Sequence, residues 1–291
     1  MKNILIATSI SPKNIEKQIE SFSTWDALGG RIVSLNHEEE FDSISTKVPF
    51  EVVKADRSAK TLLGKPFIFI DSFLDLFKQS PESHLMIVNS DIYLSEPARM
   101  RQIIEEVDAD LFFGQRVDVE RPDSTEGDLF GGFDYFLLTK DAIQLYPKSD
   151  FCMGAPWWDH WMPIVPLVKG KRAVLCSEPL VLHIKHESAW GLDPLLILGW
   201  HMAYHLKNFW GDLSEKFTKY TRSDSEAIAY HFGSFFVQYF LTRQNIDWNC
   251  YPNLDQISTD LKNTISWNAT DIFPVLTLDF VMRAVERYDL I

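Results

Sequence analysis

Three polar residues follow a buried-looking apolar run in the first third of the chain, and their types suit a charged ligand. The run Leu85 to Val88 stops at Asn89, Ser90 and Asp91. Ligands of open α/β sheets bind outside the carboxyl ends of the strands, so side chains at this point face a crevice. A carboxylate there can hold Mg²⁺ or Mn²⁺, and such a cation neutralises a leaving diphosphate. The alternative is a plain turn, because all three residue types are common in turns.

A second segment, Gly154 to Trp161, places one carboxylate and one imidazole among three indoles. Sugars stack their C–H faces on aromatic rings and direct their hydroxyls to polar groups. We therefore predict that Trp157, Trp158 and His160 bind a sugar substrate. An aromatic wall would also raise the pKa of Asp159 towards that of a general base. The alternative is that the indoles belong to the core and that Asp159 caps a helix.

The scaffold predicted around these residues is an α/β domain that covers roughly the first 190 residues. Short apolar runs end in polar or glycine-bearing turns and alternate with amphipathic segments, which predicts a mostly parallel sheet flanked by helices. The predicted strands are Ile4–Ala7, Arg31–Leu35, Phe50–Val53, Leu85–Val88, Leu111–Phe113, Phe133–Leu138, Val174–Cys176 and Leu180–Ile184. The predicted helices are Asn14–Leu28, Gly64–Lys78 and Pro97–Val107.

The pattern changes near residue 192. From Asp193 onward the sequence has longer helical patterns rich in aromatic residues, and no flexible linker precedes them. We expect residues 1–192 to form the α/β domain and residues 193–291 to form a helical region packed on it. This region is a candidate for binding an acceptor, a partner enzyme or a membrane surface, although it lacks a marked basic face.

Composition narrows the classes of ligand and the compartment. The chain has 291 residues and a formal net charge of -13, which argues against nucleic-acid binding. An anionic ligand would need a metal ion, helix N-termini or a few well-placed cations. Three cysteines form no CxxC pair, and no apolar stretch approaches the ~20 residues that span a bilayer. We expect a cytoplasmic protein, with the inner face of the membrane as an alternative location.

The strand that ends in Asn89-Ser90-Asp91 resembles the DxD region of GT-A glycosyltransferases, in the nucleotide-diphospho-sugar transferase superfamily. The family motif has two acids, and Asn89 replaces the first, so Asp91 is the matched metal ligand. The resemblance implies a Rossmann-like GT-A fold, a nucleotide-sugar donor and a divalent cation, Mn²⁺ or Mg²⁺. It also implies that Asp159 is similar to the carboxylate with which inverting members deprotonate the acceptor hydroxyl.

Some GT-A enzymes complete the metal shell with a histidine after the last core strands, which here points to the segment His183-Ile-Lys-His186. Side chains three residues apart on a strand point to opposite faces, so we do not expect both histidines to bind one ion. We favour His183 as the metal ligand. Lys185 and His186 are then candidates for contacts with the diphosphate. A structural histidine is the alternative.

The remaining candidates come from strand ends that should border the same crevice. The predicted nucleotide contacts are Thr8, Ser9, Ile10, Asn36, Glu38, Arg57, Asn89 and Ser90. The segment Gly131 to Phe136 sets Asp134 at the start of a strand and resembles the family's strand past the sugar site. Gly131 and Gly132 permit close approach of a ligand, or form a bulge.

The leading functional hypothesis is transfer of a sugar from a nucleoside diphosphate to a glycan or lipid-linked acceptor, in surface polysaccharide synthesis. One alternative is a sugar-phosphate nucleotidyltransferase. Such enzymes usually carry a glycine-rich loop after the first strand, and Thr8 to Lys13 contains no glycine. Another alternative is a noncatalytic carbohydrate-binding module, whose affinity for glycans would not depend on metal.

Overall fold

The structure is a computed structural model, and it describes residues 1–124, 126–176 and 178–186 together with the single positions Pro194, Leu198, His201 and His205. The chain divides into two compact units, Met1–Pro194 and Leu195–Ile291. The helices predicted within residues 193–291 lie outside the described residues, so they stay predictions. Within the described part, no helix is long and apolar enough to cross a membrane.

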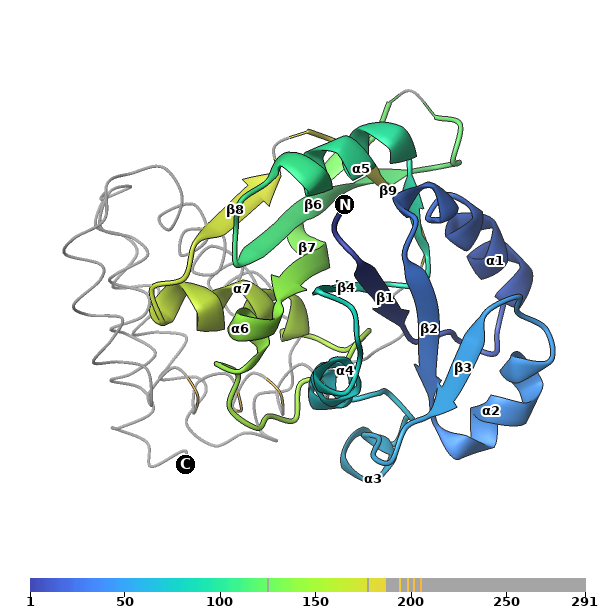
Figure 1. Cartoon of the computed structure of the whole chain (residues 1–291). Coiled ribbons are helices and arrows are strands. Elements are labelled where there is room, and N and C mark those ends of the chain that lie inside the picture. The colour runs from blue at the N-terminus through green and yellow to red at the C-terminus, as the bar shows by residue number, and fades with distance from the viewer. Residues whose placement is uncertain are drawn as a thin grey trace, which may run out of the picture. The chain divides into compact units, whose positions relative to one another are not determined.

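The first unit is built on one mixed sheet, which has nine strands in the part of the chain that the structure describes. Its order is β3-β2-β1-β4-β7-β6-β9-β5, and β8 pairs with β6 off this path. The strands are β1 Ile4–Thr8, β2 Arg31–Asn36, β3 Glu51–Lys54, β4 His84–Val88, β5 Ile92–Leu94, β6 Leu111–Val119, β7 Asp128–Thr139, β8 Ala173–Cys176 and β9 Val181–Ile184. The first four in this order run parallel, and β7 joins them antiparallel (Figure 1).

Helices flank the sheet on both faces (Figure 1). They are α1 Ile15–Ser23, the 3-10 turn η1 Asp26–Leu28, α2 Glu38–Ser45, α3 Lys60–Leu63, α4 Ile70–Lys78, α5 Pro97–Glu106, α6 Lys140–Ile143 and α7 Trp158–Val168. Apolar side chains of α1 and α5 share one core cluster with Ile4, Met86 and Tyr135 of the strands. Helix α7 packs against β6, β7 and β8. Its Trp158 contacts Phe136, whose side chain lies on the other face from that of Tyr135, because neighbouring strand residues point to opposite faces.

The apolar run Leu85 to Val88 is the buried part of β4, and the polar residues Asn89 to Asp91 follow where the strand ends. Residues Leu85 to Val88 are all buried, since β4 lies between β1 and β7 and both of its faces are covered. The chain leaves the sheet at Asn89 and re-enters it three residues later as β5. Asp91 therefore lies in a tight connection at the carboxyl edge of the parallel strands, which is the position expected for a ligand-binding residue.

Several predicted elements differ in extent from the structure. The predicted helix Asn14–Leu28 ends at Ser23 and continues only as η1, while α2 and β5 were not predicted. Strand β7 starts at Asp128, so Asp134 lies inside a strand and not at its start. Between Gln115↔Phe133 and Val117↔Leu129 the β6–β7 register shifts around Gly131 and Gly132, in line with the bulge alternative.

Candidate active site

Polar residues at the ends of β1 and β2 form a buried hydrogen-bond network. The amide of Asn36 donates to the carbonyl oxygen of Ile10 at 2.7 Å, and its Oδ1 accepts from the Ser34 hydroxyl at 2.7 Å. The Ser34 hydroxyl oxygen in turn accepts from the backbone N–H of Ile10 at 3.1 Å. These bonds fix the loop after β1 to the end of β2. Asn36 and Ile10, predicted as nucleotide contacts, thus use their polar groups to hold the loop.

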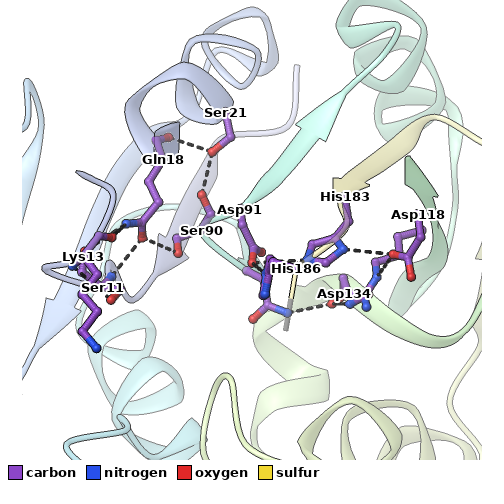
Figure 2. A network of polar contacts seen from close by, with 12 residues as sticks. Ser11, Lys13, Gln18, Ser21, Ser90, Asp91, Asp118, Asp134, His183 and His186 are labelled. Carbon is purple, nitrogen blue, oxygen red and sulfur yellow. Dashed lines mark hydrogen bonds and ion pairs between the residues drawn. The ribbon is translucent and has the colours of Figure 1, made fainter. Parts of the chain in front are cut away.

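A second network ties the loop after β1 to the loop after β4 (Figure 2). The Gln18 amide nitrogen donates to the carbonyl oxygens of Ser11 and Lys13, and Gln18 Oε1 accepts from the Ser90 hydroxyl at 2.7 Å. The Ser21 hydroxyl donates to the carbonyl oxygen of Ser90 at 2.6 Å. Ser90, predicted to contact the nucleotide, is therefore engaged with α1. Ser90, the residue before Asp91, is thus held on this side by two hydrogen bonds, one to Gln18 and one from Ser21.

Asp91 meets two histidines from the other end of the domain (Figure 2). Its Oδ2 lies 3.0 Å from His186 Nε2 and 3.4 Å from His183 Nε2, and the two Nε2 atoms are 3.0 Å apart. Pairing of β5 with β9 puts His183 opposite Ile92, the residue after Asp91. The side chain of His183 is 7% exposed, whereas those of Asp91 and His186 are 40% and 52% exposed.

The spacing of these three atoms fits the ligands of a single metal ion. Two ligand atoms that lie ~2.1 Å from one ion, at angles between 90° and tetrahedral, are about 3.0–3.4 Å apart. Neutral imidazole nitrogens and a carboxylate oxygen are lone-pair donors, so three of them converge here only with a shared proton or a cation between them. Asp91, His183 and His186 are the one such group of potential metal ligands that the described residues contain.

The expectation that His183 and His186 cannot face one ion is wrong. It applied strand geometry as far as His186, although the predicted strand and β9 both end at Ile184. His186 lies beyond the strand, where its side chain no longer alternates with that of His183, and the two rings are 4.8 Å apart between centroids. Both histidines, and not His183 alone, are therefore candidate metal ligands.

Partly buried charged side chains adjoin His183 on the side away from Asp91, and Figure 2 labels Asp118 and Asp134 among them. Asp118 Oδ1 is 2.9 Å from His183 Nδ1 and 2.7 Å from Arg116 Nε. Arg116 reaches on to Asp134 Oδ1 at 2.8 Å, and the Asn89 amide donates to that same oxygen at 2.7 Å. Three carboxylates, including Asp91, and one guanidinium leave a formal charge of about −2 when both imidazoles are neutral. A divalent cation would balance this charge.

Sequence reasoning missed Arg116 and Asp118 because it ended the strand at Phe113, whereas β6 runs to Val119. The signal was present as two charged residues at alternate positions, which in a strand point to one face. The parallel pairing of β6 with β9 sets Asp118 directly beside His183.

The neighbouring imidazoles favour the charged form of Asp91. Desolvation raises the pKa of Asp91, but the imidazoles of His183 and His186 beside it outweigh this and hold that pKa well below its usual value. The carboxylate is therefore the anion that a cation requires. Asn89, which replaces the first acid of the family motif, faces Asp134.

Asp134 lies between the two acids that the sequence singled out. Burial raises the pKa of Asp134, Arg116 opposes this, and the negative charges of Asp159 and Asp91 raise it further. Its Oδ1 accepts from Asn89 and Arg116, while the buried Oδ2 has no hydrogen-bond partner among the described residues. A buried acceptor without a donor is costly, so this oxygen is a candidate to bind a ligand hydroxyl.

Asp159 stands in the first turn of α7. Its Oδ1 lies 2.9 Å from Nδ1 of His160. Burial raises the pKa of Asp159, but His160 and the backbone N–H groups of Phe133 and His160 outweigh it, so the pKa is lowered. The predicted rise in this pKa is wrong, because the surrounding groups stabilise the anion more than the aromatic residues desolvate it. His160, predicted to bind substrate, is 2% exposed and supports Asp159.

The indoles do not form an exposed wall. Trp157 is 1% exposed and Trp158 is 3% exposed, and Trp158 begins α7 instead of lying in a loop. Both residues thus follow the core alternative, since a buried ring offers no face on which a sugar can stack. Trp157 has a φ of 74°, a backbone conformation that costs a large residue roughly 1–3 kcal/mol. This turn directs the chain into α7 and presents Asp159 in its first turn.

The other predicted nucleotide contacts, namely Thr8, Ser9, Glu38 and Arg57, differ in burial and in their partners. Thr8 is fully buried, and its hydroxyl has no partner among the described residues. Ser9 is half-buried beside it, and Glu38 is exposed at the start of α2. Arg57 lies over the ring of Phe69 and 3.6 Å from Asp150. The ends of β1, β2 and β4 lie at one edge of the sheet, as predicted. Arg57 instead forms an ion pair with Asp150.

Comparisons with known proteins give a fold and no family assignment. No model of a protein family matches the sequence, and no curated protein matches it. The solved structure of S. aureus TarS 1-349 in complex with UDP-GlcNAc is similar over 99% of this chain and 92% of that one, with 12% identity and a TM-score of 0.53. The complex of the same protein with UDP covers 99% and 91%, with 12% identity and a TM-score of 0.52. This likeness confirms the predicted GT-A-like fold.

Replacing Asn36 with alanine tests whether this residue holds the loop. We expect Asn36→Ala to lower the free energy of unfolding by about 1–3 kcal/mol, because the Ile10 carbonyl and the Ser34 hydroxyl lose their buried partner. Urea denaturation measures the change, with Asn3→Ala at an exposed asparagine as the matched control. An Asn36→Ala protein that unfolds like wild type would contradict the assignment.

Proposed function

We propose that this chain is a metal-dependent glycosyltransferase. It transfers a sugar from a nucleoside diphosphate to a hydroxyl of a glycan or lipid-linked acceptor, in the synthesis of a surface polysaccharide. The observation that carries the proposal is the convergence of Asp91, His183 and His186 at the carboxyl edge of a GT-A-like sheet. The TarS structures contain UDP-GlcNAc and UDP, which makes a uridine diphosphate sugar the first donor to test.

The three ligand side chains would hold the cation, with open positions left for the donor. When bound, the ion supplies positive charge for the diphosphate that leaves. Two imidazoles and one carboxylate favour Mn²⁺ over Mg²⁺, because magnesium prefers oxygen ligands and imidazole suits transition metals. Asn89 contributes by holding Asp134 and is not among the proposed ligands.

Asp159 is the proposed general base in an inverting reaction. A base must be ionised before it accepts a proton, and the lowered pKa of Asp159 keeps it ionised while making it a weaker base than the sequence predicted. His160 and the N–H of Phe133 hold the carboxylate in one orientation, next to Asp134 on β7. In a retaining reaction, Asp159 would orient the acceptor hydroxyl and take no proton.

Asp134 is the proposed contact to the donor sugar. Its electrostatic interactions with both Asp91 and Asp159 support a position between the proposed metal ligands and the proposed base. Oδ1 is held by Arg116 and Asn89, so Oδ2 is left to accept from a sugar hydroxyl. A hydroxyl that reaches this oxygen gains a charge-assisted hydrogen bond, worth about 1.5–3 kcal/mol.

Donor binding is expected to depend on both metal and Asp91. A ligand at 100 times its Kd stabilises the native state by about 2.7 kcal/mol. UDP-sugars with Mn²⁺ should therefore raise the melting temperature of wild type, whereas Asp91→Asn should lose the metal-dependent part of the shift. Differential scanning fluorimetry measures both, with the exposed Asp108→Asn as a control for the loss of one charge. The absence of a shift with any nucleotide diphosphate would contradict the proposal.

Asp159→Asn separates the base from donor binding. We expect turnover to fall by about 10²–10⁴-fold, because an amide cannot accept the acceptor's proton. Donor-induced stabilisation should persist, since Asp159 is not among the proposed metal ligands. Release of the nucleoside diphosphate in the presence of acceptor measures turnover. A variant that keeps more than about a tenth of the wild-type rate would exclude Asp159 as the base.

A further inference from the structure

We infer that Asp118, held in place by Arg116, is a positioning residue that orients His183 for metal binding. The inference rests on the proposed function and names residues that act through His183 and not on the substrate. Neither residue was singled out from the sequence. Both belong to the distal half of β6, which lies beside β9 in the sheet.

The sheet itself places Asp118 against His183. The parallel register pairs these two residues across β6 and β9, so their side chains leave the sheet on the same face. Asp118 Oδ1 lies 2.9 Å from His183 Nδ1, which is the ring nitrogen that does not face Asp91. A carboxylate only accepts, so Nδ1 donates its hydrogen to Asp118. The lone pair of His183 is thereby left on Nε2, the atom that faces Asp91 and His186.

Arg116 fixes Asp118 in turn. Its Nε lies 2.7 Å from Asp118 Oδ1, its Nη1 lies 2.8 Å from Asp134 Oδ1, and its guanidinium carbon lies 3.9 Å from the ring centroid of Phe130. The side chains of Arg116, Asp118 and Asp134 are 16%, 20% and 5% exposed, so water competes little for these bonds. A paired guanidinium keeps its planar donors in one orientation.

The bond from Asp118 has two physical effects on His183. It fixes the tautomer and the ring angle, so no conformational freedom of this ring is lost when an ion binds. It also increases the electron density on Nε2 and so strengthens it as a ligand. Outer partners of this kind, when mutated, typically change metal affinity by about 10–100-fold.

The experiment measures Mn²⁺ binding to the full chain by electron paramagnetic resonance, which detects free Mn²⁺ and needs no donor or acceptor. Asp118→Asn keeps the size of the side chain and removes its charge. We expect it to raise the Mn²⁺ dissociation constant by about 10–100-fold. The exposed Asp108→Asn should bind Mn²⁺ as wild type does, and Asp91→Asn should lose binding beyond the effect of Asp118→Asn.

The outcomes separate this inference from the proposed function. Wild-type affinity in Asp118→Asn, with binding lost in Asp91→Asn, would overturn the positioning role and leave the proposed function intact. Wild-type affinity in Asp91→Asn would overturn the metal site itself.

A second measurement does not depend on the stability of any variant. Two-dimensional ¹H–¹⁵N spectra of the metal-free protein, labelled with ¹⁵N-histidine, distinguish the two neutral tautomers. We expect His183, assigned by its loss in His183→Gln, to carry its hydrogen on Nδ1. A hydrogen on Nε2 of His183 would overturn the inference, even if Asp118→Asn does not fold.

Discussion

Three lone-pair atoms meet at the carboxyl edge of the sheet, and the rest of the site is arranged around them. Asp91 Oδ2 and the Nε2 atoms of His183 and His186 lie 3.0–3.4 Å from one another. Their lone pairs repel each other unless a proton or a cation lies between them. A bound cation would remove this repulsion and would also balance the carboxylates of Asp118 and Asp134.

Strand pairing brings the three ligand atoms close together. Asp91 lies in the short link between β4 and β5. Pairing of β5 with β9 brings His183 to it, together with His186 from 95 residues away along the chain. On one side Gln18 and Ser21 hold the side chain and the backbone of Ser90, and on the other Asp118, held by Arg116, holds His183. Asp134 continues the row towards Asp159. The proposed metal ligands are thus linked to Asp134 by hydrogen bonds and ion pairs, and Asp134 interacts electrostatically with the proposed base.

Much of this was predictable from local pattern, and the misses have physical causes. The buried strand before Asp91 and the α/β architecture follow from apolar runs and their turns, whereas the GT-A-like fold was implied by the resemblance of the motif that ends in Asp91. The pairing of His183 with His186 was not predictable, because it depends on how the chain turns after β9 ends at Ile184. The burial of Trp158 arises from α7 packing on β7. The lowered pKa of Asp159 arises first from His160 and then from the backbone N–H of Phe133 on β7. Arg116 and Asp118 became visible only through the register of β6 with β9.

The central claim is that two imidazoles and one carboxylate hold a single ion. Electron spin echo envelope modulation of the Mn²⁺-loaded full chain tests it directly, because ¹⁴N nuclei of bound imidazoles modulate the echo. The account predicts couplings from two imidazole nitrogens, of which one disappears in His183→Gln and the other in His186→Gln. A spectrum without nitrogen coupling, or one unchanged in both variants, would contradict it.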